Sequence, residues 1–153
     1  MTQDYYGTKR ITAYKQEKDG KAGYGVIYAD GYQSWSPADV FEAAHQPITA
    51  MSFGHALQAL KEGHRVARAG WNGKGMWIAL TTGSSFPADM AKPGHAAKHR
   101  ADEMEPQVGH DITLLPHIDM RAADGSMVVG WLASQTDMLA DDWMMVATTE
   151  GTV

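Results

Sequence analysis

The chain has 153 residues, of which 44% are hydrophobic and 20% are charged, the balance of an ordinary globular protein. It contains no cysteine, so disulfides, thiolate metal ligands and cysteine nucleophiles are excluded. The formal net charge of −5 argues against salt-driven binding to DNA, and no apolar run approaches the roughly 20 residues that span a bilayer.

The N-terminal part of the chain predicts a hairpin followed by a short helix. Residues 11–14 and 24–28 have strand composition, and Asp19-Gly20 between them is a turn signal because glycine tolerates positive φ. A helix is expected over residues 36–44, with Ser36 as N-cap, proline in the first helical position and an aspartate in the first turn. We therefore treat residues 1–47 as an N-terminal hairpin-helix module, which needs the rest of the protein to bury its apolar side.

A second domain is predicted over residues 51–147, because nine of the ten methionines lie there and all six tyrosines lie before it. Its first element is a helix over 53–62, where apolar residues recur with the period of one helical face after a serine N-cap. Strands are expected over 65–68 and 76–82, joined by a glycine-rich loop over 70–75.

Residues 83–113 are rich in proline, glycine and histidine, and they predict a loop-rich insertion. After it we expect a hairpin of 117–123 with 127–131, a helix over 134–140 and a last strand over 143–147. Since no strand–helix–strand unit repeats, the fold class predicted is α+β, with a mostly antiparallel sheet and short helices.

The segment RVARAGWNGKG, residues 65–75, is the most informative for function. Its glycines let backbone N–H groups approach an anion, and Arg65 and Arg68 add positive charge. Trp71 offers a ring for stacking on a purine, and the amide of Asn72 both donates and accepts hydrogen bonds. The segment suits a nucleotide, but a tight turn with solvated arginines and a core tryptophan explains the same residues.

A second polar cluster follows at the start of the last predicted helix. Ser134, Gln135, Thr136 and Asp137 lie where backbone donors and the helix dipole favour an anion. Simple capping is the alternative, with Ser134 as N-cap and Asp137 at the third helical position.

Neither a metal site nor a catalytic centre is expected. His95 and His99 are four residues apart, with His110 and His117 downstream, but no HExxH motif occurs and solvated loop histidines explain the pattern. Paired carboxylates beside a base, GxSxG and a histidine-supported nucleophile are not found as local motifs, although a triad scattered in sequence stays open.

From Met51 to about Val146 the chain resembles a family of small phage and prophage proteins that includes the second Thoeris anti-defence family. The resemblance lies in MSFGHALQALKEGHRVARAGWNGKGMWIAL and DMRAADGSMVVGWLASQTDMLADDWMMV, within which WNGKGM and WLASQTDMLADDW are specific. It covers about two-thirds of the chain, and the tyrosine-rich residues 1–50 form an N-terminal extension.

The resemblance implies a sponge that binds cyclic ADP-ribose isomers, or related cyclic oligonucleotides, without cleaving them. It also implies a homo-oligomer, commonly a tetramer, that has ligand pockets between its subunits. Such a protein is expected to act in the cytoplasm of the infected host cell. It is expected to need no cofactor and to bind neither membrane nor DNA. The pocket that it implies comprises Phe53, Trp71, Asn72, Gly73, Trp131, Gln135, Thr136 and Asp137. Charge adds Arg65 and Arg68, and the predicted helix start adds Ser134.

The sequence is also compatible with two other functions. One is a nucleotide hydrolase, which loss of the ligand over time would reveal. The other is a structural or interaction protein of a phage with no small-molecule ligand. The N-terminal extension and the insertion over 83–113 could each cover, reshape or replace the pocket.

Overall fold

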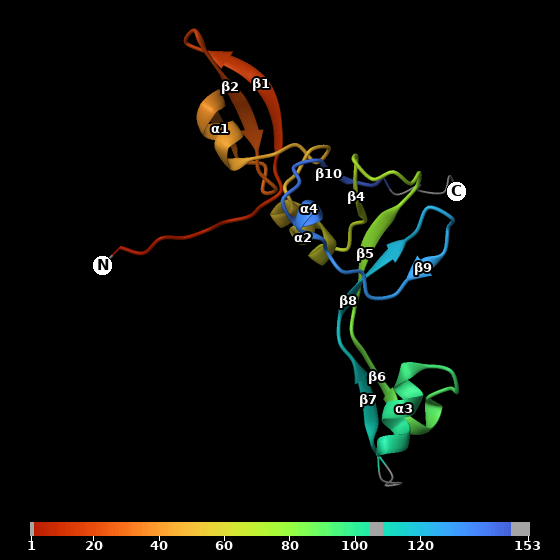
Figure 1. Ribbon diagram of the computed structural model, residues 1–153. Helices are drawn as coiled ribbons and strands as arrows, with labels where there is room; N and C mark the ends of the chain where they lie inside the picture. The colour runs from red at the N-terminus through yellow and green to blue at the C-terminus, as the bar shows by residue number, and fades with distance from the viewer. Residues whose placement is uncertain (1, 105–108, 148–153) are drawn as a thin grey trace, which may run out of the picture.

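The computed structural model describes residues 2–104 and 109–147, and it has the α+β class that the sequence predicts. The described strands form three antiparallel sheets, in the orders β1-β2-β3, β10-β4-β5-β8-β9 and β6-β7. The strands are β1 (Thr12–Lys18), β2 (Lys21–Ile27), β3 (Gln33–Pro37), β4 (Val66–Arg68), β5 (Trp77–Thr81), β6 (Ser84–Pro87), β7 (Asp111–Leu114), β8 (His117–Arg121), β9 (Met127–Val128) and β10 (Trp143–Met145). The α-helices are α1 (Ala38–Ala44), α2 (Phe53–Lys61), α3 (Ala96–Glu103) and α4 (Gln135–Met138) (Figure 1).

The N-terminal residues form a three-stranded sheet with α1 packed on β2 and β3. The expected hairpin is present, and Asp19 and Gly20 both have positive φ at its turn, as a tight hairpin turn requires. The strand β3 was not predicted, and the assignment of Ser36 as N-cap is wrong. Ser36 pairs with Tyr24 in the sheet, so α1 begins one residue later, after Pro37.

The five-stranded sheet carries the main hydrophobic core on one side, which we call the core face. Val66, Ile78 and Trp143 lie on this face and are fully buried against Leu60 of α2. The predicted cap of α2 is confirmed, because the side chain of Ser52 accepts a hydrogen bond from the backbone N–H of His55. The other side of the sheet, which carries Ala67, Trp77 and Arg121, is called the outer face.

The segment between the two parts is tied to the five-stranded sheet. The carbonyl of Ile48 accepts a hydrogen bond from Met145 N at 2.8 Å, and Met51 pairs with Trp143. The side chain of Gln46 accepts a further bond from Ser52 N at 2.6 Å. These bonds place the N-terminal sheet at the end of the body where β10 and α2 lie (Figure 1).

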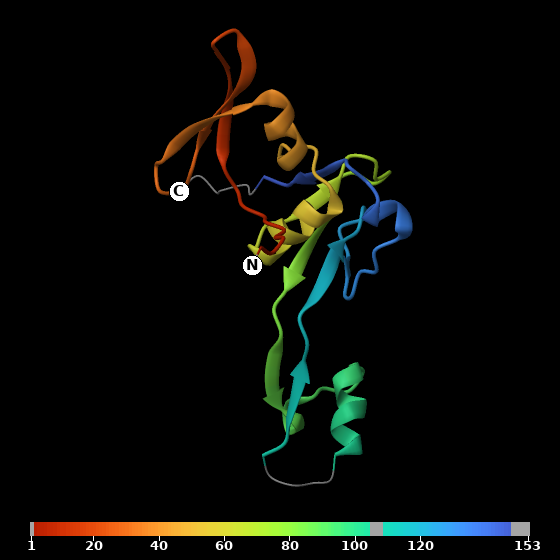
Figure 2. The ribbon, with the colours of Figure 1, turned by 90° about the vertical axis from the view of Figure 1, so that its left-hand side faces the viewer.

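Residues 83–113 differ most from expectation. In place of a loop, they hold β6, β7, α3 and a short 3₁₀ helix, Ala88–Met90. Ala91 and Ile112 are buried in this part of the chain. Both ribbon views show this arm projecting away from the rest of the chain (Figures 1 and 2). Short strands made of serine, phenylalanine and proline give too little alternation to be recognised in sequence.

The last elements are shorter than predicted. The second strand of the hairpin ends at Val128 rather than 131, because Gly130 has a φ of +81° and its N–H bonds to Asp119 instead of continuing the ladder. Helix α4 ends at Met138 rather than 140, and β10 ends at Met145. Among the helices of the described ranges, none is long and apolar enough to cross a membrane.

Candidate functional site

Four aromatic side chains from separate parts of the sequence meet on the core face. Trp71 and Trp143 have ring centroids 5.4 Å apart, and Trp131 lies 6.2 Å from Trp71 with an edge-on geometry. Phe53, from the first turn of α2, lies 5.4 Å from Trp143. Trp143 is fully buried, whereas the other three rings remain partly exposed. Three of these four residues, Phe53, Trp71 and Trp131, are site residues predicted from the sequence. Trp143 is the buried ring against which they pack.

Asp137 connects the rings to the charged residues. Its carboxylate accepts hydrogen bonds from Trp71 Nε1 at 3.1 Å and from Arg68 Nη1 at 2.8 Å. It also forms a reciprocal capping box with Ser134. Burial by itself would raise the pKa of Asp137, but the bonds from Ser134, Arg68 and Trp71 outweigh it and lower the pKa to about 2. The capping alternative is thus realised, and this carboxylate is charged at neutral pH.

A second carboxylate, Asp142, completes the arrangement and was not singled out in the sequence. It accepts hydrogen bonds from Arg68 Nε at 2.8 Å and from Gly70 N at 2.7 Å. The bond from Arg68 is the main cause that lowers the pKa of Asp142. Asp142 adjoins the strand that pairs with β4, and only that pairing brings it beside Arg68, so its role has no local sequence signal beyond its place in WLASQTDMLADDW.

The glycine-rich loop is held to its own chain at several points. The N–H of Gly70 donates a hydrogen bond to the carboxylate of Asp142. Gly73 packs so closely against its neighbours that an added Cβ would lie 2.3 Å from Met76 Sδ and 2.6 Å from Ala123 Cβ. Asn72 between them is exposed. The glycines therefore serve close packing as well as turning, and Asn72 is presented to solvent next to Trp71.

The remaining predicted residues divide into two groups. Gln135 and Thr136 are exposed at the start of α4, close to the ring cluster because α4 packs on α2. Arg65 lies on the outer face of the sheet, where its guanidinium is over the Trp77 ring. This follows because side chains alternate along a strand and the next residue, Val66, is buried in the core. Direct contacts thus join six of the predicted site residues: Phe53, Arg68, Trp71, Trp131, Ser134 and Asp137. Asn72, Gly73, Gln135 and Thr136 are their neighbours in the chain, and Arg65 lies apart on the outer face.

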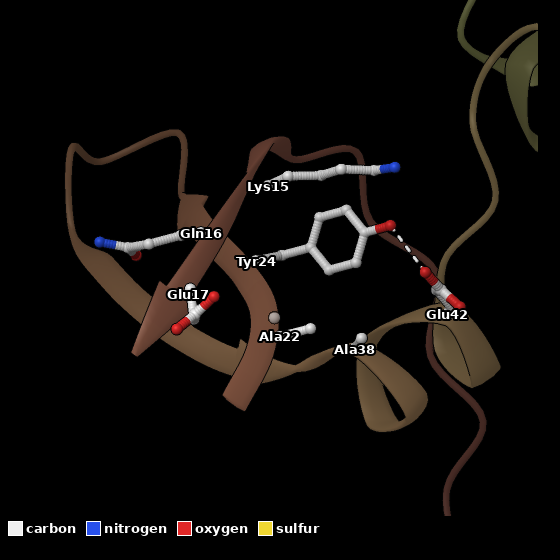
Figure 3. Close-up of a pocket in the computed structure, with 8 residues that line it drawn as sticks. Lys15, Gln16, Glu17, Ala22, Tyr24, Ala38 and Glu42 are labelled. Atoms are coloured by element: carbon white, nitrogen blue, oxygen red, sulfur yellow. Dashed lines mark hydrogen bonds between the residues drawn. The ribbon is translucent and has the colours of Figure 1, made fainter. Parts of the chain in front are cut away.

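A separate groove lies in the N-terminal sheet, between β1, β2 and α1 (Figure 3). It has a volume of about 340 Å³ and is lined by Lys15, Gln16, Glu17, Ala22, Gly23, Tyr24, Ala38 and Glu42. The hydroxyl of Tyr24 donates to Glu42 at 2.7 Å, and this bond is the main cause that raises the pKa of Tyr24. The groove is open and most of its lining side chains are exposed, so it presents a mixed-charge surface around one tyrosine.

Metal-ligating side chains are dispersed in the part of the chain that the structure describes. No group of three or more histidine, aspartate and glutamate residues comes together there in a geometry that could hold a metal ion. His95 and His99 lie on the arm, at the start of and within α3, and His117 lies at the base of the arm beside Asp119.

Comparison with known proteins identifies the domain that carries the ring cluster. Residues 51–146 match the family model described as the Thoeris anti-defense 2-like domain. The chain is also similar to Thoeris anti-defense 2 of Bacillus phage SP01, with 37% identity over 99 residues, which cover 65% of this chain and 98% of that protein. The matched residues include the whole ring cluster and the Arg68, Asp137 and Asp142 network, and they leave the N-terminal sheet outside. The chain therefore belongs to the Thoeris anti-defense 2-like family.

Proposed function

We propose that this protein binds a cyclic ADP-ribose-type immune signal, or a related cyclic nucleotide, and sequesters it without cleaving it. The observation that carries the proposal is that the family match includes all of the ring cluster. The name of the similar phage protein, Thoeris anti-defense 2, supports an action against the same defence system in an infected bacterial cell.

The proposed binding mode assigns different tasks to the predicted residues. The partly exposed rings of Trp71 and Trp131 stack on or flank the adenine, and Phe53 supports them from α2. Asn72 and the backbone amides that follow it hold the ribose or pyrophosphate, and the exposed Gln135 and Thr136 supply further polar contacts.

Arg68, Asp137 and Ser134 act as a frame in this proposal. The charge of Arg68 is compensated by two carboxylates, and that of Asp137 by Arg68 and by hydrogen bonds. Such a frame fixes the indole of Trp71 before the ligand arrives. A preorganised site loses less conformational entropy on binding, which is the requirement for tight sequestration.

We further propose that the protein is a homo-oligomer, a tetramer, and that a second copy completes the pocket. Val129, Leu132 and Leu139 flank Trp131 and α4 in sequence and are 74%, 90% and 79% exposed. Large apolar side chains that are this exposed in one neighbourhood are typical of an association surface. A copy packed here would also enclose the exposed edges of Trp71 and Trp131.

The test is calorimetric titration of the purified full chain with a panel of cyclic ADP-ribose isomers and cyclic dinucleotides. The bound ligand is then released by heat and analysed by chromatography. Tight binding with the ligand recovered intact supports sequestration. A ligand recovered in fragments would identify an enzyme, and no heat with any ligand would favour a structural or interaction role.

A further inference from the structure

The strand β1 is an open edge of the N-terminal sheet. It pairs on one side only, with β2, and all seven of its residues are exposed. Helix α1 packs on β2 and β3, and both ribbon views show the β1–β2 hairpin extending past α1 (Figures 1 and 2). An exposed strand edge is a template for pairing with another chain unless its own residues prevent it.

The opposite edge of the same sheet is protected. Strand β3 ends in Pro37, which has no N–H to donate, and α1 begins at the next residue. Strand β1 has the sequence TAYKQEK, with neither proline nor glycine. Of the two edges, β1 is therefore the one that is able to accept a further strand along its whole length.

The backbone groups that β1 presents at its open edge follow from the turn. Lys18 and Lys21 flank a two-residue turn, so they form a hydrogen-bonded pair. Hydrogen-bonded pairs alternate with pairs that are not hydrogen-bonded along an antiparallel ladder. The N–H and carbonyl groups of Ala13, Lys15 and Glu17 therefore point away from β2. In the part of the chain that the structure describes, these groups have no other backbone partner.

The charges of β1 favour one pairing with a second copy of the same strand. In an antiparallel pair centred on Gln16, Lys15 of each copy lies opposite Glu17 of the other. Tyr14 then lies opposite Lys18. This register also matches the backbone, because Lys15 and Glu17 both carry outward groups. Centring the pair on Lys15 or on Glu17 would instead place like charges directly opposite each other, which is destabilising.

The side chains of Lys15 and Glu17 are available for that pairing. Neither forms an ion pair with another residue in the described ranges. Both line the groove beside Tyr24, whose hydroxyl already donates to Glu42. Figure 3 shows Lys15 and Gln16 extending to opposite sides of β1, as alternation along a strand requires. Ion pairs between two copies would therefore form on the side of the groove.

We infer that β1 is an interaction surface for a second copy of this chain, and that the two β1 strands pair antiparallel about Gln16. The pairing joins two N-terminal sheets into one continuous sheet. Each pair of Lys15 with Glu17 exchanges two N–H···O bonds, and the opposite charges fix the register. The family match begins at residue 51, so this contact lies outside it and is separate from the surface around Leu132. It does not depend on the proposed ligand.

The test is disulfide cross-linking of the full chain, which contains no cysteine of its own. In the inferred register Gln16 faces its own copy in a pair that is not hydrogen-bonded, with Cα atoms about 4.5 Å apart, which a disulfide spans. Gln16→Cys should therefore give a disulfide-linked dimer in a glutathione redox buffer, measured on a gel without reductant. Lys18→Cys is the matched control on the same exposed strand, because its two copies would be about 13 Å apart.

Charge reversal tests the register itself. In the Gln16→Cys chain, Lys15→Glu places like charges opposite each other and should lower the yield of linked dimer about tenfold. Adding Glu17→Lys should restore the yield, because the exchange recreates both ion pairs. Leu132→Glu changes the other proposed association surface and should leave the linked dimer in place.

Four results would overturn the inference. Equal linking of Gln16→Cys and Lys18→Cys would show random collision. Absence of the Gln16→Cys dimer is the result expected if the edge binds a peptide of another protein instead. A yield that does not respond to Lys15→Glu, or one that is lost in Leu132→Glu, would show that β1 does not pair in this register by itself. Thermal melting checks that each variant is folded.

Discussion

The guanidinium of Arg68 lies 2.8 Å from the carboxylate of Asp137, although the two residues are 69 positions apart in the sequence. This pair links β4 to α4, and through Asp137 it also holds the indole of Trp71. Both side chains are largely shielded from solvent, with exposed fractions of 16% and 13%. A residue that was predicted to attract an anionic ligand is therefore bound to two anions of its own chain, and the ring cluster depends on that arrangement.

The first prediction concerns Asp142. Asp142→Ala leaves Arg68 with one carboxylate and Gly70 N without its acceptor, so we expect the free energy of unfolding to fall by about 2 kcal/mol. Urea denaturation measures this change. The matched control is Asp141→Ala, which removes an exposed neighbouring carboxylate and should change stability by less than about 0.5 kcal/mol. Equal effects of the two variants would contradict the assigned role.

The second prediction concerns pH and Asp137. Its folded pKa of about 2 lies below the ordinary value of 3.8, so its stabilisation is complete above about pH 4 and is lost as the pH falls toward 2. Asp137→Asn does not titrate, so its stability deficit relative to the parent should shrink by on the order of 2 kcal/mol between pH 5 and pH 2. Urea unfolding at several pH values tests this, and a deficit independent of pH would refute it.

The third prediction uses two glycines of different surroundings. Gly73→Ala should destabilise the fold by about 1–3 kcal/mol, because the new Cβ meets Met76 and Ala123 at less than van der Waals distance. Gly54→Ala, within α2, meets only Ser52 Oγ at 3.8 Å and should be neutral or stabilising by up to about 1 kcal/mol. Thermal melting compares the two variants. If Gly73→Ala were neutral, the loop would not pack as described.

The fourth prediction concerns ligand binding at Asn72. If the proposed site is correct, Asn72→Ala should weaken binding of the cyclic nucleotide by about 1–3 kcal/mol, because buried partners on the ligand lose their hydrogen bonds. Stability should hardly change, since Asn72 is exposed in the described chain. Calorimetric titration and a thermal melt on the same sample measure both quantities. Unchanged affinity would place the pocket elsewhere.

The fifth prediction concerns association. Leu132→Glu puts a charge on a side chain that is 90% exposed beside the ring cluster, and we expect it to reduce the oligomer to smaller species. Leu115→Glu, which alters a leucine 74% exposed at the base of the arm, is the control for a general effect of charge. Light scattering after gel filtration gives the masses. A parent chain that is already monomeric, or a Leu132→Glu variant that keeps the parent mass, would exclude this surface.

Local rules predicted much of the chain. The turn at Asp19-Gly20, the cap at Ser52 and the capping box at Ser134 depend on residues that are close in sequence, and each is present. The α+β class followed from the same kind of pattern. The strand β3 and the arm were missed, because a short strand that carries serine and proline is stabilised by its partners rather than by its own composition.

The sequence by itself determined that aromatic, amide and cationic groups cluster in two segments, because those residues are adjacent in the chain. Only the tertiary structure decided how they are used. The alternation of side chains along β4 separates Arg65 from Arg68, and the pairing of β4 with β10 brings Asp142 to Arg68. Whether a charge is free or neutralised depends on neighbours that are distant in sequence, and folding alone brings those neighbours within hydrogen-bond distance.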